Sequence, residues 1–149
     1  MMEKNICPIG STLDYFNRKW IFCILSNIFR GMKHFSEFKK ANPTISNHIL
    51  AETLRYMEEN GLIIKTVIDD GPKLKTEYSL TEKGRKTNRI LYEITSYYFN
   101  ELNFVGYEDS QKENILKEYK NAFGIEWLSF YFFFYFILGL FSIFFTVIL

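Results

Sequence analysis

Cysteine and histidine are scarce in this chain of 149 residues, which holds two of each. Cys7 and Cys23 are too few for a disulfide framework, and no Cys-x-x-Cys pair or histidine cluster has the spacing of a metal site. The sequence also lacks a glycine-rich phosphate loop, a nucleophile with a paired base and a carboxylate pair in an apolar setting. These absences argue against an enzyme, and we expect neither a metal nor another cofactor.

The first ten residues, MMEKNICPIG, contain no apolar run that could serve as a secretory signal. We therefore expect a cytoplasmic domain in a reducing compartment. The length suits one ordinary domain with an appendage. Residues 1–104 hold 15 lysines and arginines against 12 acidic residues, whereas residues 105–149 hold 3 against 5. The front part is mildly basic and the rear part mildly acidic.

Hydrophobic spacing predicts four helices in the first 61 residues. Cys7 followed by Pro8 resembles a helix N-cap with proline at the first position. Ser46 is a natural N-cap and Gly61 a natural C-terminal glycine for the fourth helix. The predicted helices span about 8–16, 20–29, 35–40 and 47–60, and the second is apolar around most of its circumference, which is typical of a buried central helix.

Two β-branched, apolar runs follow, LIIKTVI and LKTEYSL, and the turn-forming residues DDGP join them. They predict a β-hairpin. Thr81 then caps a predicted long helix, about 82–103, with a wide apolar stripe. Helices, a two-stranded hairpin and a long helix in this order predict a mainly α (α+β) winged helix-turn-helix with a two-stranded wing.

The fourth helix has the polar first turn that a recognition helix needs when its N-terminus points at base edges in a major groove. Asn47 and His48 offer both donors and acceptors, and an acidic first turn would repel phosphate. The alternative is that Ser46, Asn47 and His48 merely form a capped surface start.

Basic residues surround this helix, and together they have the electrostatic footprint of phosphate binding, although each lysine alone could be a solvated surface charge. We expect the DNA-binding residues to be Lys39, Lys40, Ser46, Asn47, His48, Ala51, Glu52, Arg55, Lys65, Lys73 and Lys75.

The segments CPIGSTLDYFNRKWIFCIL, HFSEFKKANPTISNHILAETLRYMEENGLI and EYSLTEKGR resemble the HxlR family of bacterial transcription regulators, relatives of MarR, over about residues 7–104. The resemblance implies a homodimer that binds double-stranded DNA at a palindromic operator, with one recognition helix in each half-site. It also implies local regulation, often of detoxification or redox-stress genes. Dimerisation through the first and last helices of the domain would use Ile9, Leu13, Phe16, Ile94, Tyr98 and Leu102.

Cys7 corresponds to an N-terminal cysteine that senses oxidants or electrophiles in several similar regulators. A thiol at a helix N-terminus meets the positive end of the helix dipole, which favours the thiolate. A purely structural cap is the alternative. We expect Cys23 to be an inert core thiol and His34 to be a surface residue.

The chain departs from the family at its end, where the 23 residues after Glu126 carry no charge and include 8 of the 16 phenylalanines. A helix of that length spans about 34 Å, enough to cross a bilayer core of about 30 Å. We therefore expect a DNA-binding and dimerisation domain at 1–104, a polar, helical spacer at 105–124 and a hydrophobic transmembrane helix at 125–149, with residues 127–149 anchoring the protein to the cell membrane. An unselected apolar tail and a helix folded back onto the dimer are the alternatives.

A winged-helix module that binds protein instead of specific DNA is the alternative function. It would show little salt-dependent affinity for DNA.

Overall fold

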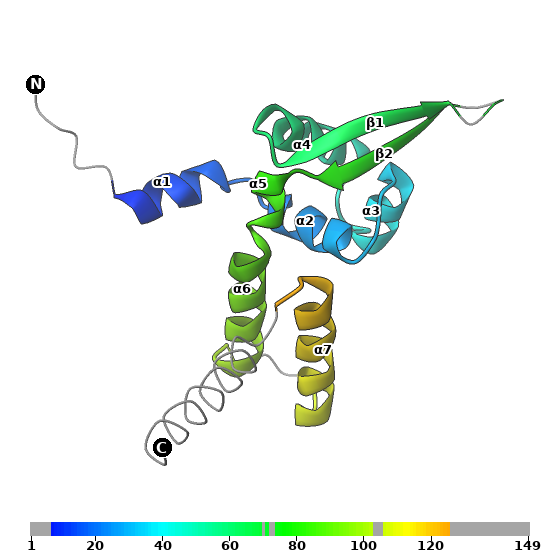
Figure 1. Ribbon diagram of the computed structural model, residues 1–149. Helices are drawn as coiled ribbons and strands as arrows, with labels where there is room; N and C mark the ends of the chain where they lie inside the picture. The colour runs from blue at the N-terminus through cyan, green and yellow to red at the C-terminus, as the bar shows by residue number, and fades with distance from the viewer. Residues whose placement is uncertain (1–6, 70, 72–73, 103–105, 126–149) are drawn as a thin grey trace, which may run out of the picture.

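The computed structural model of the chain describes residues 7–69, 71, 74–102 and 106–125. Its elements follow in the order α1 (Pro8–Tyr15), α2 (Ile21–Phe29), α3 (Phe35–Ala41), α4 (Asn47–Glu59), β1 (Ile63–Asp69), β2 (Leu74–Leu80), α5 (Glu82–Arg85), α6 (Asn88–Asn100) and α7 (Asp109–Ala122) (Figure 1). The order confirms the predicted winged helix-turn-helix with a two-stranded wing. The first four helices also begin and end close to the predicted residues.

α2 supplies the centre of the hydrophobic core. Ile21, Ile24 and Leu25 on this helix are fully buried. They belong to one cluster with buried residues of α3, α4 and both strands, among them Phe38, Leu50, Leu54, Met57, Ile63, Tyr78 and Leu80. Cys23 is exposed, which shows that the helix buries one side rather than its whole circumference. The prediction of a core thiol at this position was therefore wrong.

The wing is an antiparallel pair in which Ile63 lies opposite Leu80 and Asp69 lies opposite Leu74. Ile63 and Leu80 are buried at its base, while the remaining β1 residues are exposed. The backbone N–H of Tyr78 donates to the carbonyl of Lys33 at 2.8 Å. The segment before α3 therefore lies along the second edge of β2 and joins the wing to the helical part.

The junction between α4 and β1 is unusually close to α5. α4 ends at Glu59 and is followed by Asn60 and Gly61. The φ of Gly61 is 68°, which is left-handed, and the N–H of Leu62 donates to the carbonyl of Met57 at 2.8 Å. The carbonyl of Leu62 accepts the N–H of Thr81 at 3.1 Å, which holds the start of α5 against the junction. A Cβ on Gly84 would lie 2.1 Å from the Leu62 oxygen, so only glycine allows this approach.

The predicted continuous helix at 82–103 was wrong, since α5 and α6 are separate helices. The break falls at Thr87, which is buried and donates its hydroxyl to the carbonyl of Gly84 at 2.7 Å. The N–H of Thr87 donates to the same carbonyl at 3.1 Å. A threonine that engages a carbonyl three residues earlier competes with the regular helical pattern, which explains the turn.

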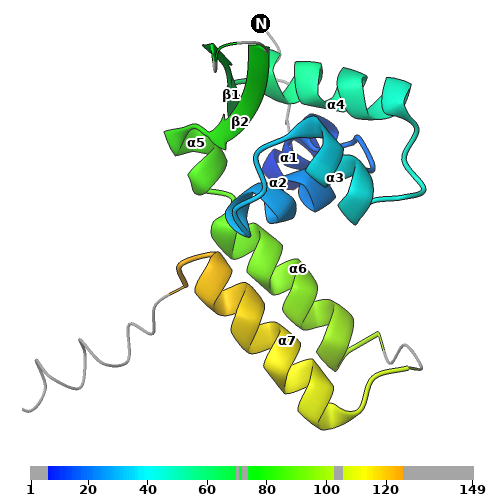
Figure 2. The ribbon, with the colours of Figure 1, turned by 90° about the vertical axis from the view of Figure 1, so that its right-hand side faces the viewer.

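α7 lies beside α6 and runs in the opposite direction (Figure 2). Its C-terminal neighbour Phe123 is buried, with its ring centroid 5.2 Å from that of Phe29 and 5.4 Å from that of Tyr119. The side-chain amide of Asn88 donates to the Phe123 carbonyl at 3.1 Å. α7 lies within the segment predicted as a spacer, 105–124, and it folds back onto α2 and α6.

Among the residues that the structure describes, no helix is long and apolar enough to cross a membrane. The predicted anchor at 127–149 lies outside those residues.

Gly84→Ala should destabilise the fold by about 1–3 kcal/mol, because a methyl group cannot fit against the Leu62 carbonyl without moving backbone. Gly10→Ala is the matched control, since a Cβ there would meet its nearest atom at 3.7 Å and alanine favours a helix. Urea denaturation monitored by circular dichroism measures both. Equal free energies of unfolding for the two variants would contradict the close-approach explanation.

Candidate nucleic-acid interface

α3, the following turn and α4 form the helix-turn-helix, and three polar side chains hold its turn. The Asn42 amide donates to the carbonyl of Phe38 at 2.9 Å. The ammonium of Lys39 donates to the carbonyl of Pro43 at 3.0 Å and also to that of Ile45. Ser46 accepts the N–H of Ile49 at 3.2 Å and so caps α4. Lys39 and Ser46, both predicted DNA contacts, therefore have structural partners of their own.

The first turn of α4 beyond this cap is open to solvent. Asn47 and His48 are exposed. The Asn47 side chain has no hydrogen bond to any other described residue, and His48 makes only a long contact, with its Nε2 3.7 Å from the Glu52 carboxylate. Polar groups that lack firm partners are available to a ligand, so this turn is the part of α4 best placed to contact one.

The outer face of α4 continues with Ala51, Glu52, Arg55 and Glu59. Ala51 is exposed, and Arg55 lies 3.9 Å from Glu59 in a solvent-exposed pair. Exposed pairs at this spacing contribute little stability, about 0.3–0.5 kcal/mol, and they exchange partners readily. The structure therefore brings Ala51, Glu52 and Arg55 onto the predicted surface, where the two acidic side chains temper the positive charge.

Three of the predicted phosphate-binding lysines are exposed and have no ion pair within the described part of the chain, namely Lys40, Lys65 and Lys75. The strand register places Lys65 opposite Tyr78 and Lys75 opposite Ile68. Opposite residues share a face and successive residues alternate, so these two lysines lie on different faces of the wing. Lys73 lies outside the described residues.

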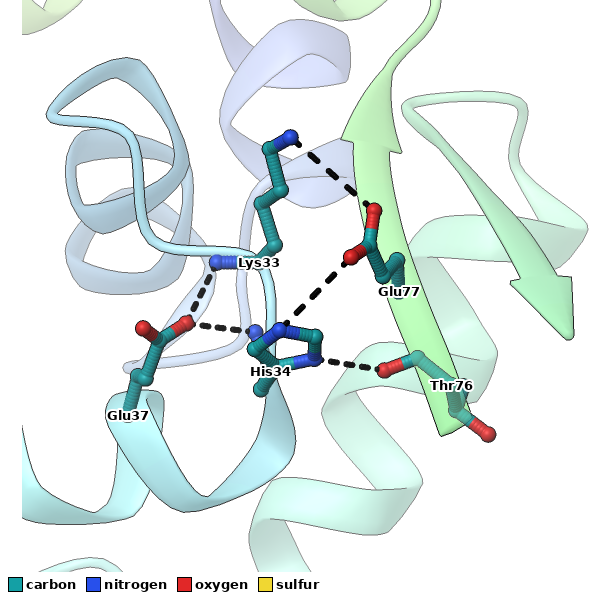
Figure 3. A network of polar contacts seen from close by, with 5 residues as sticks. All are labelled: Lys33, His34, Glu37, Thr76 and Glu77. Carbon is teal, nitrogen blue, oxygen red and sulfur yellow. Dashed lines mark hydrogen bonds and ion pairs between the residues drawn. The ribbon is translucent and has the colours of Figure 1, made fainter. Parts of the chain in front are cut away.

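A polar network that the sequence reasoning missed joins α3 to the wing (Figure 3). His34, predicted as a surface residue, is half-buried, and its Nδ1 lies 2.9 Å from the carbonyl of Thr76 on β2. Its Nε2 lies 3.7 Å from the carboxylate of Glu77, which also lies 3.9 Å from the Lys33 ammonium. These contacts fix the wing relative to the helix-turn-helix.

Glu37 completes this network at the N-terminus of α3. One carboxylate oxygen accepts the backbone N–H groups of Lys33 at 2.7 Å and His34 at 2.8 Å. Those hydrogen bonds hold the pKa of Glu37 below its usual value, because they favour the charged form. A glutamate three residues after a helix cap is the spacing of a capping box, and this signal could have revealed the network.

The two cysteines differ in their surroundings. Cys7 is the N-cap residue of α1, as predicted, but its sulfur makes no capping hydrogen bond. Burial of the Cys23 thiol raises its pKa, and the nearby charge of Lys19 opposes that effect only in part. Both residues nevertheless reach solvent.

No group of three or more histidine, cysteine and acidic side chains in the described ranges is placed to hold a metal ion. The exposed, polar start of α4 with lysines on both sides remains the feature that most resembles a ligand surface.

The sequence and the fold of this chain are similar to those of known proteins. A family model described as HxlR-like helix-turn-helix matches residues 15–103. The chain is 33% identical over 98 residues to the uncharacterized HTH-type transcriptional regulator YvaP of Bacillus subtilis, covering 65% of this chain and 90% of YvaP. It superposes on the reduced form of the redox regulator HypR with a TM-score of 0.61 and 31% identity, covering 65% of this chain and 95% of HypR. The reduced form of the transcriptional regulator YodB from B. subtilis matches with a TM-score of 0.54 and 26% identity, covering 66% of this chain and 99% of YodB.

Proposed function

This chain belongs to the HxlR-like helix-turn-helix family of transcription regulators, and we propose that it acts as a homodimer that binds a palindromic operator with one α4 in each half-site. The family consists of regulators rather than enzymes, as the sequence predicted. The observation that carries the proposal is the exposed first turn of α4, whose Asn47 and His48 lack firm partners in the described structure.

The chemistry of that turn suits base edges. The Asn47 amide can donate and accept together, which is how asparagine pairs with adenine in a major groove. His48 can contact a base or a phosphate once it leaves Glu52. The helix N-terminus adds a partial positive charge that favours the approach of phosphate.

Lysines on either side of α4 would contribute to the affinity for DNA through phosphate contacts that do not depend on the base sequence. Lys40 lies at the end of α3, and Lys65 and Lys75 lie on the wing, all exposed. Each phosphate contact releases a counterion, so binding should weaken as the salt concentration rises. Because Lys65 and Lys75 lie on different faces of the wing, a duplex would meet both only along the edge or tip of the hairpin.

Dimerisation would bury exposed apolar residues at the two ends of the domain. On α1, Ile9 is 72% and Leu13 62% exposed. Ile94, in the middle of α6, is 48% exposed, and Leu102, two residues beyond the end of α6, is 47% exposed. Phe16 and Tyr98, the other two predicted interface residues, are half-buried and pack within the subunit, Phe16 against Phe22 and Tyr98 against Phe99. We therefore assign the subunit contact to the four exposed side chains first.

The alternative, a module that binds protein, is favoured by one observation. The wing exposes several aliphatic side chains, with Ile64 50%, Val67 56% and Leu74 74% exposed. Apolar surface of this kind suits a protein partner better than phosphate. Salt dependence discriminates the two functions.

His48→Ala should weaken binding to the preferred duplex by roughly 1–3 kcal/mol and relax its sequence preference, because a base-edge contact is lost. Lys75→Ala should weaken all duplexes alike and lower the salt slope by about 1. Fluorescence anisotropy titrations would use the duplex that the intact chain selects from a random library and an unrelated duplex, at several salt concentrations. The number of chains bound per duplex checks the dimer, because a duplex with two half-sites should bind two chains.

Glu113→Ala on α7, far from the surface proposed to bind DNA, is the control and should bind as the wild type does. Equal effects of His48→Ala and Lys75→Ala on both duplexes would contradict the division of roles. Weak, salt-independent binding to every duplex would instead favour the protein-binding module.

We also propose that Cys7 senses electrophiles, which is supported by its exposed place at the start of α1 and by the likeness to a redox regulator. Iodoacetamide should alkylate Cys7 faster than Cys23, because burial raises the pKa of the Cys23 thiol and so lowers its thiolate fraction. Cys7→Ser should leave DNA binding intact and abolish its response to the reagent, while Cys23→Ser should keep that response. Mass spectrometry gives the two rates, and equal rates would argue against a sensor at Cys7.

Finally, we propose that residues 127–149 tether the regulator to the membrane, on the strength of their sequence alone, 23 residues without a charge. The intact chain should appear in the membrane fraction of cells, and a chain ending at residue 125 should not. Recovery of the unclipped chain in the soluble fraction without detergent would refute the tether.

A further inference from the structure

The residues of α1 that pack against the core lie at its C-terminal end. None of its eight residues is buried. Its first turns project away from the helix-turn-helix (Figure 1), whereas Tyr15 and the following Phe16 are half-buried and pack against the core. The direction of α1 therefore depends on the contacts made by its last turn.

Two tyrosine hydroxyls join that last turn to the C-terminal half of α4. The hydroxyl of Tyr56 on α4 donates to the carbonyl of Tyr15 at 3.0 Å. The hydroxyl of Tyr15 donates to the carbonyl of Asn60, the C-cap of α4, at 2.8 Å. The two bonds run in opposite directions between the same two segments, so they resist both sliding and rotation.

Two cations lie over the tyrosine rings. The guanidinium of Arg18 lies 4.5 Å from the centre of the Tyr56 ring, and the Lys83 ammonium lies 4.5 Å from that of Tyr15. Lys83 also donates to the Asn60 carbonyl at 3.0 Å. A cation at the C-terminal end of a helix meets the negative end of its dipole, so this arrangement is electrostatically favourable. We name these five residues the tyrosine clamp: Tyr15, Arg18, Tyr56, Asn60 and Lys83.

We propose that Tyr15 and Tyr56 are positioning residues for operator binding, because their hydroxyls fix the angle between α1 and the recognition helix. The inference rests on the proposed homodimer. Where α1 contacts the second subunit, its angle to α4 decides how far apart and in which orientation the two recognition helices stand.

The geometry makes the angle important. α1 has eight residues, about 12 Å at 1.5 Å per residue, so a rotation of about 10° at the clamp moves its far end by about 2 Å. Half-sites on B-DNA are about 34–36 Å apart, and one base pair of spacing is about 3.4 Å along the axis. Loss of a clamp hydrogen bond should therefore reduce the difference in affinity between duplexes with different half-site spacings.

Tyr56→Phe tests the inference, since it removes the hydroxyl and keeps the ring under Arg18. Tyr92→Phe on α6 is the matched control, a half-buried tyrosine whose hydroxyl bonds to no other described residue. The intact chain would first select its preferred duplex from a random library. Titrations would then use that duplex, versions with the spacing between half-sites changed by one base pair either way, and an unrelated duplex.

Tyr56→Phe should bind the selected duplex about fivefold more weakly, because a less firmly held α1 must be ordered on binding, and should discriminate less between spacings. Its affinity for the unrelated duplex should stay within error of that of Tyr92→Phe. An unchanged spacing profile, or an equal loss on all four duplexes, would overturn the inference. Tyr15→Phe provides a second variant with the same expected profile.

Hydrogen exchange separates failure of the clamp from failure of the proposed function. Without DNA, the amides of α1 should exchange at least threefold faster in Tyr56→Phe than in the wild type and Tyr92→Phe. Unchanged exchange would overturn the clamp whatever the DNA result. Faster exchange in a protein that selects no duplex would support the clamp but overturn its role in operator binding and the proposed function with it.

Discussion

The left-handed conformation at Gly61 is the constraint on which the proposed binding surface depends. Three residues, 60–62, separate the end of α4 at Glu59 from the start of β1 at Ile63. The Leu62 carbonyl accepts the N–H of Thr81, and the backbone of Gly84 packs against it. α4, the wing and α5 are thus connected at one point. Because that point lies at the C-terminal end of α4, the N-terminal turn can remain exposed without loosening the helix.

Local rules predicted the ends of α4 but not the contacts that orient it. Capping depends on residues adjacent in sequence, so Ser46 and Gly61 could be recognised from their positions alone. The clamp between Tyr15 and Tyr56 and the contact between His34 and β2 join residues about 40 apart, and no periodicity encodes such pairs. The predicted DNA-binding residues therefore stay a prediction, and two of them, Lys39 and Ser46, hydrogen-bond within the subunit.

Other differences arise where tertiary packing overrides a helical pattern. The stripe through residues 82–103 is continuous in sequence, yet the side chain of Thr87 competes for a helical carbonyl and starts a new helix. Cys23 lies in an apolar stretch, but α2 buries only the side with Ile21, Ile24 and Leu25 and leaves Cys23 exposed. Residues 109–122 are polar enough to suggest a spacer, and it is the aromatic Phe123 just beyond them that secures α7 against Phe29.

α7 lies beyond the part of the chain that the family model matches. Its position decides which side of α6 remains exposed for contact with a second subunit. At 100° per residue, Ile90, Ile94 and Tyr97 lie on one side of α6, whereas Tyr92, Thr95 and Phe99 lie on the opposite side. The first three are exposed and the last three are half-buried, and Phe99 lines a cavity of about 360 Å³ with Asp109, Lys112 and Leu116 of α7. α7 thus covers the side of α6 opposite Ile90, Ile94 and Tyr97. Those three side chains remain exposed, so a second subunit can pack against them. Growth at the C-terminus is compatible with the proposed dimer for this geometric reason.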